Sequence, residues 1–102
     1  MFNIIARKIH LEYCKKYPDA KNGLLGWYHE LEKSNFDNLN ELKSNYPDVS
    51  IIGDHRIIFN ILGNKYRLIV RILFNYKAIQ IKWFGTHSEY DKVDALKVQH
   101  KK

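Results

Sequence analysis

A strict alternation of side-chain type between residues 65 and 74 is the strongest constraint on how this 102-residue chain folds. One set of alternate positions is apolar or aromatic throughout and comprises Tyr66, Leu68, Val70, Ile72 and Phe74. The other set carries three cations and comprises Lys65, Arg67, Ile69, Arg71 and Leu73. Because successive side chains of a strand point to opposite faces, this pattern predicts a β-strand with one face in the core and a cationic face toward solvent.

Two further strands flank this segment and are joined to it by short turns. Residues 56–61 precede a turn signal at 62–64, and residues 78–84 follow a second turn at 75–77. Successive strands with turns this short predict an antiparallel meander. Trp83 has the parity of the apolar positions in the last strand, so we expect it in the core.

The first half of the chain has helical spacing instead. Three helices are predicted there, over residues 6–17, 24–34 and 38–46, after a short strand at 3–5. Asn38 is a suitable N-cap for the third helix, with Glu41 as its capping-box partner. A short final helix is predicted around residues 91–96. We therefore expect an α+β fold, with N-terminal helices packed on one face of a small antiparallel β-sheet, a short C-terminal helix, and a single domain spanning residues 1–102.

Positive charge is concentrated in the second half of the chain. Residues 1–50 contain seven basic and seven acidic side chains, whereas residues 51–102 contain ten basic and four acidic ones and so carry the whole net charge of +6. No Asp or Glu lies between His55 and Ser88. Alternate residues of a strand are roughly 6.6 Å apart, close to the phosphate spacing of an extended single strand. The charge therefore favours a polyanionic partner, most commonly a nucleic acid.

Other classes of function have no motif to support them. The chain has no P-loop, dinucleotide-binding glycine pattern, metal-ligand spacing or Ser-His-Asp signature, so we expect no metal ion and no cofactor. Four histidines lack ligand spacing and are expected at the surface, namely His10, His29, His55 and His100. No apolar run reaches membrane-spanning length, and the N-terminus lacks a signal-peptide pattern, which predicts a cytoplasmic protein without a membrane partner.

A chemically reactive segment, Gly85 to Asp91, follows the last predicted strand directly. It brings His87, Tyr90 and two carboxylates to the mouth of the basic surface. RNA can be cut without a metal ion when a base removes the 2′-OH proton, a cation stabilises the phosphorane and an acid protonates the leaving 5′ oxygen. His and Tyr suit the proton transfers, and Arg and Lys suit the phosphate.

Three segments in the second half resemble the motifs of a known family. They are Ile-Phe-Asn-Ile at 58–61, Gly-Asn-Lys-Tyr-Arg-Leu at 63–68 and Phe-Gly-Thr-His-Ser-Glu-Tyr-Asp-Lys at 84–92. In this order, near the end of a chain of this length, they resemble HigB-type toxins, which are RelE-superfamily mRNA interferases of bacterial type II toxin–antitoxin systems. The resemblance implies a RelE-like fold and metal-independent cleavage of mRNA at the A site of the translating 70S ribosome, through a 2′,3′-cyclic phosphate. It also implies neutralisation by a helix-turn-helix antitoxin of the HigA type.

The matching positions give a hypothetical site. The catalytic candidates are His87, Arg67, Arg71, Tyr90 and Asp91. His87 is the general acid or base, the two arginines bind phosphate and stabilise the transition state, Tyr90 stacks on a base or assists proton transfer, and Asp91 orients His87. The RNA-binding candidates are Lys65, Lys82, Asn60, Asn64 and Arg56. The two asparagines have an alternative role as hydrogen-bond formers in turns and at strand ends.

Two alternatives remain at this stage. The same charge asymmetry also fits a non-catalytic nucleic-acid-binding module, because cations alone bind phosphate. It further fits an interaction protein whose basic groove receives an acidic segment of a partner. Cleavage products in a translating extract, or their absence, separate the ribonuclease from both alternatives.

Overall fold

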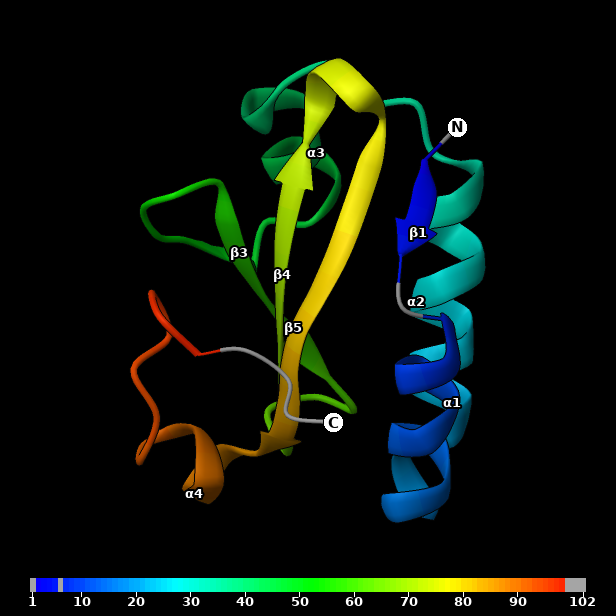
Figure 1. Ribbon diagram of the computed structural model, residues 1–102, viewed down its shortest axis with the longest axis vertical. Coiled ribbons are helices and arrows are strands. Elements are labelled where there is room, and N and C mark those ends of the chain that lie inside the picture. The colour runs from blue at the N-terminus through cyan, green and yellow to red at the C-terminus, as the bar shows by residue number, and fades with distance from the viewer. Residues whose placement is uncertain (1, 6, 99–102) are drawn as a thin grey trace.

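The computed structural model describes residues 2–5 and 7–98, with helices mainly in the first half and strands mainly in the second (Figure 1). The helical elements are α1 (Arg7–Lys16), the short 3-10 helix η1 (Pro18–Ala20), α2 (Lys21–Lys33), α3 (Leu39–Asn45), the 3-10 helix η2 (Phe74–Tyr76) and α4 (His87–Tyr90). The strands are β1 (Asn3–Ile5), β2 (Ser50–Ile51), β3 (Arg56–Ile61), β4 (Tyr66–Leu73) and β5 (Ala78–Thr86). The predicted α+β fold is confirmed.

The strands form one five-stranded sheet in the order β1-β5-β4-β3-β2. The predicted antiparallel meander is made by β3, β4 and β5. The sheet as a whole is mixed, because β1 pairs in parallel with β5 at one edge. Side-chain alternation predicts which face a strand buries, but it carries no information about which distant segment pairs with the edge.

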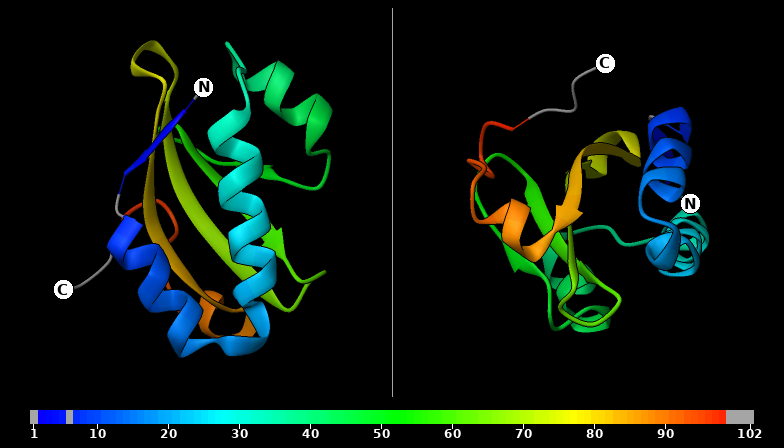
Figure 2. Two further views of the ribbon diagram at one scale, coloured as in Figure 1. Left: turned by 90° about the vertical axis from the view of Figure 1, so that its right-hand side faces the viewer. Right: turned by 90° about the horizontal axis from the view of Figure 1, so that it is seen from below.

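Helices α1 and α2 lie side by side on one face of the sheet (Figure 2). The main core lies between them and the sheet. Its fully buried side chains include Leu24, Leu31, Leu42, Ile57, Leu68, Val70, Ile72 and Ile79. The apolar alternate positions predicted for the central strand therefore do face the helices.

His10 belongs to this core, contrary to the expectation that it is exposed. It is 0% exposed, and its Nε2 is 3.0 Å from the carbonyl oxygen of Leu24. It lies one helical turn before Tyr13 and Cys14, which are also buried. His10 is buried because it lies on the inner face of α1. Its hydrogen bond to Leu24 offsets the cost of burying a polar imidazole. His100 lies outside the described residues.

Helix α2 begins at Lys21, three residues before its predicted start, and the N-terminal ends of α4 and α3 also differ from expectation. The final helix spans His87–Tyr90 and so ends before the predicted region, and residues 91–96 are not helical. Thr86 caps this helix: the Thr86 hydroxyl accepts from the N–H of Glu89, and the Glu89 carboxylate accepts from the N–H of Thr86. At α3 the Asn38 cap forms as predicted. The Glu41 carboxylate, however, accepts from the N–H of Asp37 instead of Asn38, so no capping box forms there.

A β-bulge between β4 and β5 places Trp83 on the face that was predicted to be cationic. Val70 pairs with Ile81, but Ile69 pairs with Trp83, so one extra residue of β5 is inserted between these pairs. Trp83 therefore shares a face with Arg67, and it is half-buried instead of lying in the main core. The extra residue reverses the parity on which the core expectation rested.

The face away from α1 and α2 is only partly open. Ile58 and Ile69 lie on it and are buried, at 3% and 0% exposed. The chain after α4 lies on this side of the sheet (Figure 2). It is held there by Arg56, whose guanidinium Nη1 donates to the carbonyls of Ala95 (2.9 Å) and Val98 (2.7 Å). The exposed cations are therefore confined to the ends and margins of this face.

Candidate active site

The site is built where β4 begins and β5 ends. Tyr66 pairs with Thr86, and the backbone N–H of His87 donates to the carbonyl of Lys65 at 3.0 Å, one step beyond the last paired residues of the ladder. The capping box of Thr86 then turns the chain into α4. This places the His87 helix directly against the first residues of the cationic strand, with no loop between strand and helix.

His87 and Asp91 form a pair on one side of α4. The His87 Nδ1 lies 3.6 Å from Asp91 Oδ2, and the two side chains are 49% and 62% exposed. This separation is longer than a hydrogen bond, but it is close enough for the carboxylate to attract an imidazolium and to orient the ring. Both groups are open to a ligand approaching from solvent.

Tyr90, on the same helix as His87, contacts the cationic strand. The guanidinium carbon of Arg67 lies 5.9 Å from the centre of the Tyr90 ring, and Arg67 Nη1 is 3.4 Å from Asn64 Oδ1. The Trp83 ring lies 6.3 Å from the Tyr90 ring, tilted by 52°. We call these six residues the α4 cluster: Asn64, Arg67, Trp83, His87, Tyr90 and Asp91. Four of the five catalytic candidates belong to it.

Lys65 is next to the α4 cluster, but its ammonium group contacts an acid from the first half of the chain. Its Nζ forms an ion pair with Asp19, which also accepts a hydrogen bond from the Tyr66 hydroxyl. The hydrogen bond from Lys65 lowers the pKa of Asp19, and donation to Asp19 raises the pKa of Tyr66 to about 12. Lys65 is 58% exposed. It can reach a phosphate only by exchanging this partner.

Arg71 and Lys82 form a separate cationic group farther along the sheet. Arg71 is four residues from Arg67 on the same strand, a distance of about 13 Å. Its Nε donates to the Asp54 carbonyl at 3.2 Å, and its Nη2 contacts the Asp54 carboxylate at 3.4 Å. Partial burial, and then the nearby charges of Arg56 and Arg71, lower the pKa of Lys82. The structure therefore does not bring Arg71 to His87.

Arg56 does not have the exposed position that its assignment to RNA binding requires. It is 4% exposed, and its guanidinium is used to hold the carbonyls of residues 95 and 98. Arg56 is paired with Arg71 on the outer face of the sheet, but the chain after α4 covers that part of the face. We therefore remove Arg56 from the candidate RNA-binding residues.

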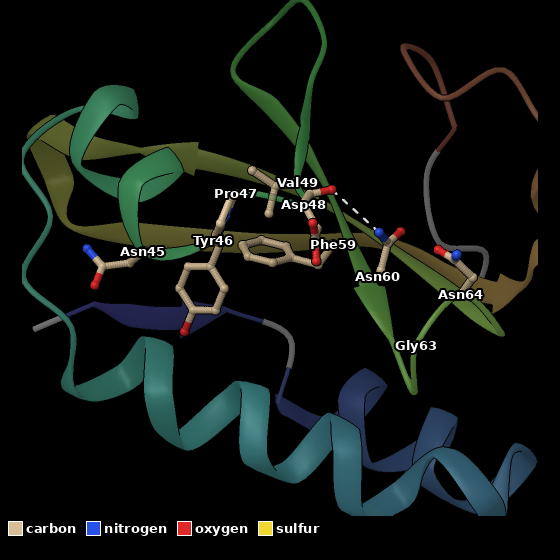
Figure 3. A pocket seen from close by; sticks show the side chains of 9 residues that line it. All are labelled: Asn45, Tyr46, Pro47, Asp48, Val49, Phe59, Asn60, Gly63 and Asn64. Carbon is tan, nitrogen blue, oxygen red and sulfur yellow. Dashed lines mark hydrogen bonds between the residues drawn. The ribbon is translucent and has the colours of Figure 1, made fainter.

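Asn60 borders a cavity of about 580 Å³ beside the outer edge of β3 (Figure 3). Its Nδ2 donates to the Asp48 carbonyl at 3.4 Å. The rings of Tyr46 and Phe59 form one wall, with their centres 5.4 Å apart. Asn64 lines the same cavity, so the cavity adjoins the α4 cluster. Asn60 thus has the strand-end hydrogen bond that was its alternative role.

Comparison with known proteins agrees with the motifs and the fold. The sequence profile of the HigB toxin family, described as the RelE-like toxic component of a toxin–antitoxin system, matches residues 20–93. This match covers more than half of the chain and includes the whole α4 cluster. The chain belongs to the HigB toxin family.

Curated relatives of this HigB-family chain match over nearly its full length. The mRNA interferase toxin HigB of Escherichia coli strain K12 is 28% identical over 96 residues, which cover 92% of each chain. The mRNA interferase HigB of Shigella flexneri matches with the same values. The mRNA interferase HigB of Escherichia coli O6:H1 is 26% identical over 93 residues, covering 89% of this chain and 90% of the relative.

Sequence reasoning about this HigB-family member missed one residue of the cluster, Trp83. In the structure β5 has nine residues and β4 eight, and the extra residue of β5 forms the bulge. The strands expected from the sequence, at 65–74 and 78–84, gave no signal of it. The bulge position itself is set by packing on both faces and is not visible in the alternation.

In residues 2–5 and 7–98, no group of three or more His, Cys, Asp or Glu side chains is arranged to hold a metal ion. In the same part of the chain, no helix has the length and apolar character needed to cross a membrane.

Proposed function

We propose that this chain is an mRNA interferase toxin, an endoribonuclease that cuts translated mRNA and so inhibits translation and growth. The observation that carries the proposal is the α4 cluster, in which Arg67 and Tyr90 are in contact beside the His87–Asp91 pair on an exposed cationic edge. The names of the curated relatives support the same activity.

The proposed reaction uses the nucleophile that RNA itself carries. The 2′ oxygen attacks the adjacent phosphorus, and the bond from phosphorus to the 5′ oxygen breaks, which leaves a 2′,3′-cyclic phosphate and a free 5′-OH. One group of the site accepts the 2′-OH proton, and a second donates a proton to the 5′ oxygen. His87 and Tyr90 are the groups proposed for these transfers.

The remaining members of the cluster have supporting roles. Arg67 binds the phosphate and stabilises the additional negative charge of the phosphorane. Asp91 holds the imidazole of His87 in orientation. Arg71 and Lys82 bind neighbouring phosphates of the same strand, and Lys65 does so when it exchanges Asp19 for a phosphate. Because RNA supplies the nucleophile and side chains supply the proton transfers, the proposed reaction needs no metal ion.

We further propose that the chain acts as one domain on mRNA in the A site of the 70S ribosome, and that a helix-turn-helix antitoxin of the HigA type neutralises it. The family description as the toxic component of a toxin–antitoxin system supports an antitoxin partner. The net charge of +6 supports association with RNA and with an acidic antitoxin segment.

The test is mRNA cleavage in a translating bacterial extract, with 5′ ends mapped, for the wild type and two variants. The wild type should cut mRNA, and His87→Ala and Arg67→Ala should each reduce the rate by about 100-fold or more. Tyr76→Leu is the matched control, because Tyr76 is 79% exposed and lies on η2, at the other end of β5 from α4.

Purified mRNA without ribosomes tests the ribosome requirement in the same assay. Intact mRNA in the translating extract would refute the ribonuclease proposal. Salt-dependent RNA binding without any cleavage product would instead support the non-catalytic binding module.

A further inference from the structure

Trp83 is an aromatic side chain placed on a cationic surface by a backbone irregularity. The bulge in β5 turns it to the face of Arg67, where it is only half-buried. In the described part of the chain, the other tryptophan, Trp27, is 4% exposed in the core. A large apolar ring left partly open to water next to phosphate-binding cations is a feature of single-strand binding surfaces.

The indole of Trp83 packs closely against a glycine. A Cβ atom added to Gly85 would lie 2.6 Å from Cη2 and 2.7 Å from Cζ2 of Trp83, so the six-membered ring of the indole lies against the Gly85 backbone. Gly85 is the cross-strand partner of Arg67. The ring therefore lies over the same part of the sheet that presents the guanidinium.

The neighbours of Trp83 are those expected around a bound nucleotide. Tyr90 is close to both Trp83 and Arg67, with a ring-centre distance of 6.3 Å to the indole and 5.9 Å to the guanidinium carbon. Lys82, the preceding residue, is also half-buried and lies close to Arg71. Trp83 pairs with Ile69, which lies between Arg67 and Arg71 on β4. The indole thus lies between Arg67, proposed to bind the reacting phosphate, and the cations Arg71 and Lys82, proposed to bind the next phosphates.

We propose that Trp83 is a stacking platform for one base of the RNA strand, at a nucleotide adjoining the phosphate bound by Arg67. This role rests on the proposed function, because it takes single-stranded RNA as the ligand. Stacking does not depend on base identity, since every base presents a π face. Trp83 therefore contributes affinity and positions the scissile phosphate without selecting a particular base.

The first test is tryptophan fluorescence during titration with a 2′-O-methyl RNA oligonucleotide, which lacks the 2′-OH nucleophile and cannot be cut. Stacking should quench the wild-type emission. The variant Trp83→Phe should bind with similar affinity but without that quenching, because the buried Trp27 has no access to the ligand. Trp83→Leu should bind about tenfold more weakly, within the range expected for loss of one base–aromatic stack.

The second test is cleavage in the translating extract, which covers the case in which RNA binds only on the ribosome. Trp83→Leu should raise the mRNA concentration needed for half-maximal cleavage, Trp83→Phe should restore it, and Tyr76→Leu should match the wild type. Thermal unfolding of each variant shows whether it is folded. The comparison of Phe with Leu separates stacking from a purely structural role in supporting Tyr90.

The outcomes distinguish the stacking role from the proposed function. Cleavage by Trp83→Leu at wild-type efficiency overturns the stacking role and leaves the ribonuclease proposal intact. Quenching by the oligonucleotide with no cleavage by the wild type supports the stacking role and refutes the ribonuclease proposal. Loss of activity that Trp83→Phe does not restore also overturns stacking, because a phenyl ring retains a π face.

Discussion

At the scale of single residues, Arg67 and Arg71 show how two identical side chains on one strand face acquire different environments. Arg67 contacts Tyr90 and Asn64 in the α4 cluster. Arg71 is 31% exposed and interacts with Asp54, about 13 Å farther along the strand. Only Arg67 is therefore near the groups proposed to transfer protons.

This difference predicts unequal effects of substitution. Arg67→Ala should lower the cleavage rate by about 100-fold or more, because it removes charge stabilisation at the reacting phosphate. Arg71→Ala should lower it by about tenfold or less, because it removes binding to a neighbouring phosphate that Lys82 also approaches. The rates are measured in the translating extract at saturating mRNA. Equal losses for the two variants would contradict the assignment of distinct roles.

The residues that sequence reasoning placed correctly are those whose environment depends on alternation alone. Arg67 lies on the outer face because of its position in a regular strand. Trp83 was misplaced because one bulge residue reverses the parity of part of β5. Arg56 was misplaced because a segment about forty residues later covers it, a long-range contact that no local pattern encodes.

At the scale of elements, α4 is held in place by hydrogen bonds to its third residue, Glu89, one of which comes from a distant part of the chain. Glu89 accepts a hydrogen bond from the N–H of Thr86 and a second, at 2.9 Å, from the hydroxyl of Tyr17. Tyr17 comes directly after α1, so this carboxylate connects the N-terminal helices to the helix of His87. The hydrogen bond from Thr86 lowers the pKa of Glu89 below its ordinary value of 4.5.

Because the pKa of Glu89 is lowered in the folded protein, its contribution to stability depends on pH. A carboxylate whose folded pKa is below its unfolded pKa stabilises the fold above the unfolded value, and this stability is lost as the pH falls through the folded pKa. Glu89→Gln should therefore be less stable than the wild type near neutral pH, by about 1 kcal/mol or less because the group is exposed to solvent. The difference should shrink below pH 4.5. Urea unfolding at several pH values measures it, and a difference that grows on acidification would contradict the assignment.

The segment after α4 is held in place by a buried arginine, Arg56. Arg56 donates to two carbonyls of this segment, at Ala95 and Val98. Arg56→Met keeps an apolar stem of similar length but removes both hydrogen bonds. We expect faster amide hydrogen exchange in residues 91–98, measured by mass spectrometry, and a loss of about 1–2 kcal/mol in the free energy of unfolding. Unchanged exchange in this segment would show that other contacts hold it.

The elements that the sequence predicts well are those with a long, regular period. Strand β3 has the predicted bounds, and β4 and α3 differ from theirs by one residue at each end. The start of α4 was not predicted, because the capping box of Thr86 and Glu89 acts more strongly than the apolar spacing of 91–96. The pairing of β1 with β5 was not predicted, because it joins segments about 75 residues apart.

At the scale of the whole molecule, folding partly neutralises the cationic block that the sequence shows. Acids from the first half pair with two of its lysines: Asp19 with Lys65, and Asp37 with Lys77 at 2.8 Å. Asp54, just outside the block, pairs with Arg71. Among the described residues, Arg67 and Lys82 take part in none of these ion pairs. The surface available to a polyanion is therefore smaller than the acid-free stretch suggests.

This arrangement predicts the salt dependence of RNA binding. For a single strand, the logarithm of the binding constant falls with the logarithm of salt concentration by about 0.7 for each phosphate neutralised. Two or three available cations give a slope of about −1.4 to −2, whereas phosphate contacts from all six basic residues of the block would give about −4. Fluorescence anisotropy with a 2′-O-methyl oligonucleotide at several KCl concentrations measures the slope.

Two matched variants show which cations are responsible. Asp19→Asn releases Lys65 beside the α4 cluster and should steepen the slope by about 0.7, one additional phosphate contact. Asp37→Asn makes the same change in charge but releases Lys77, which precedes β5 at the end of the strand away from α4, and should leave the slope unchanged. An equal increase in both variants would mean that RNA responds to net charge alone. In that case the bound RNA strand would have no fixed path across the protein surface, and the α4 cluster could not hold one phosphate in position for cleavage.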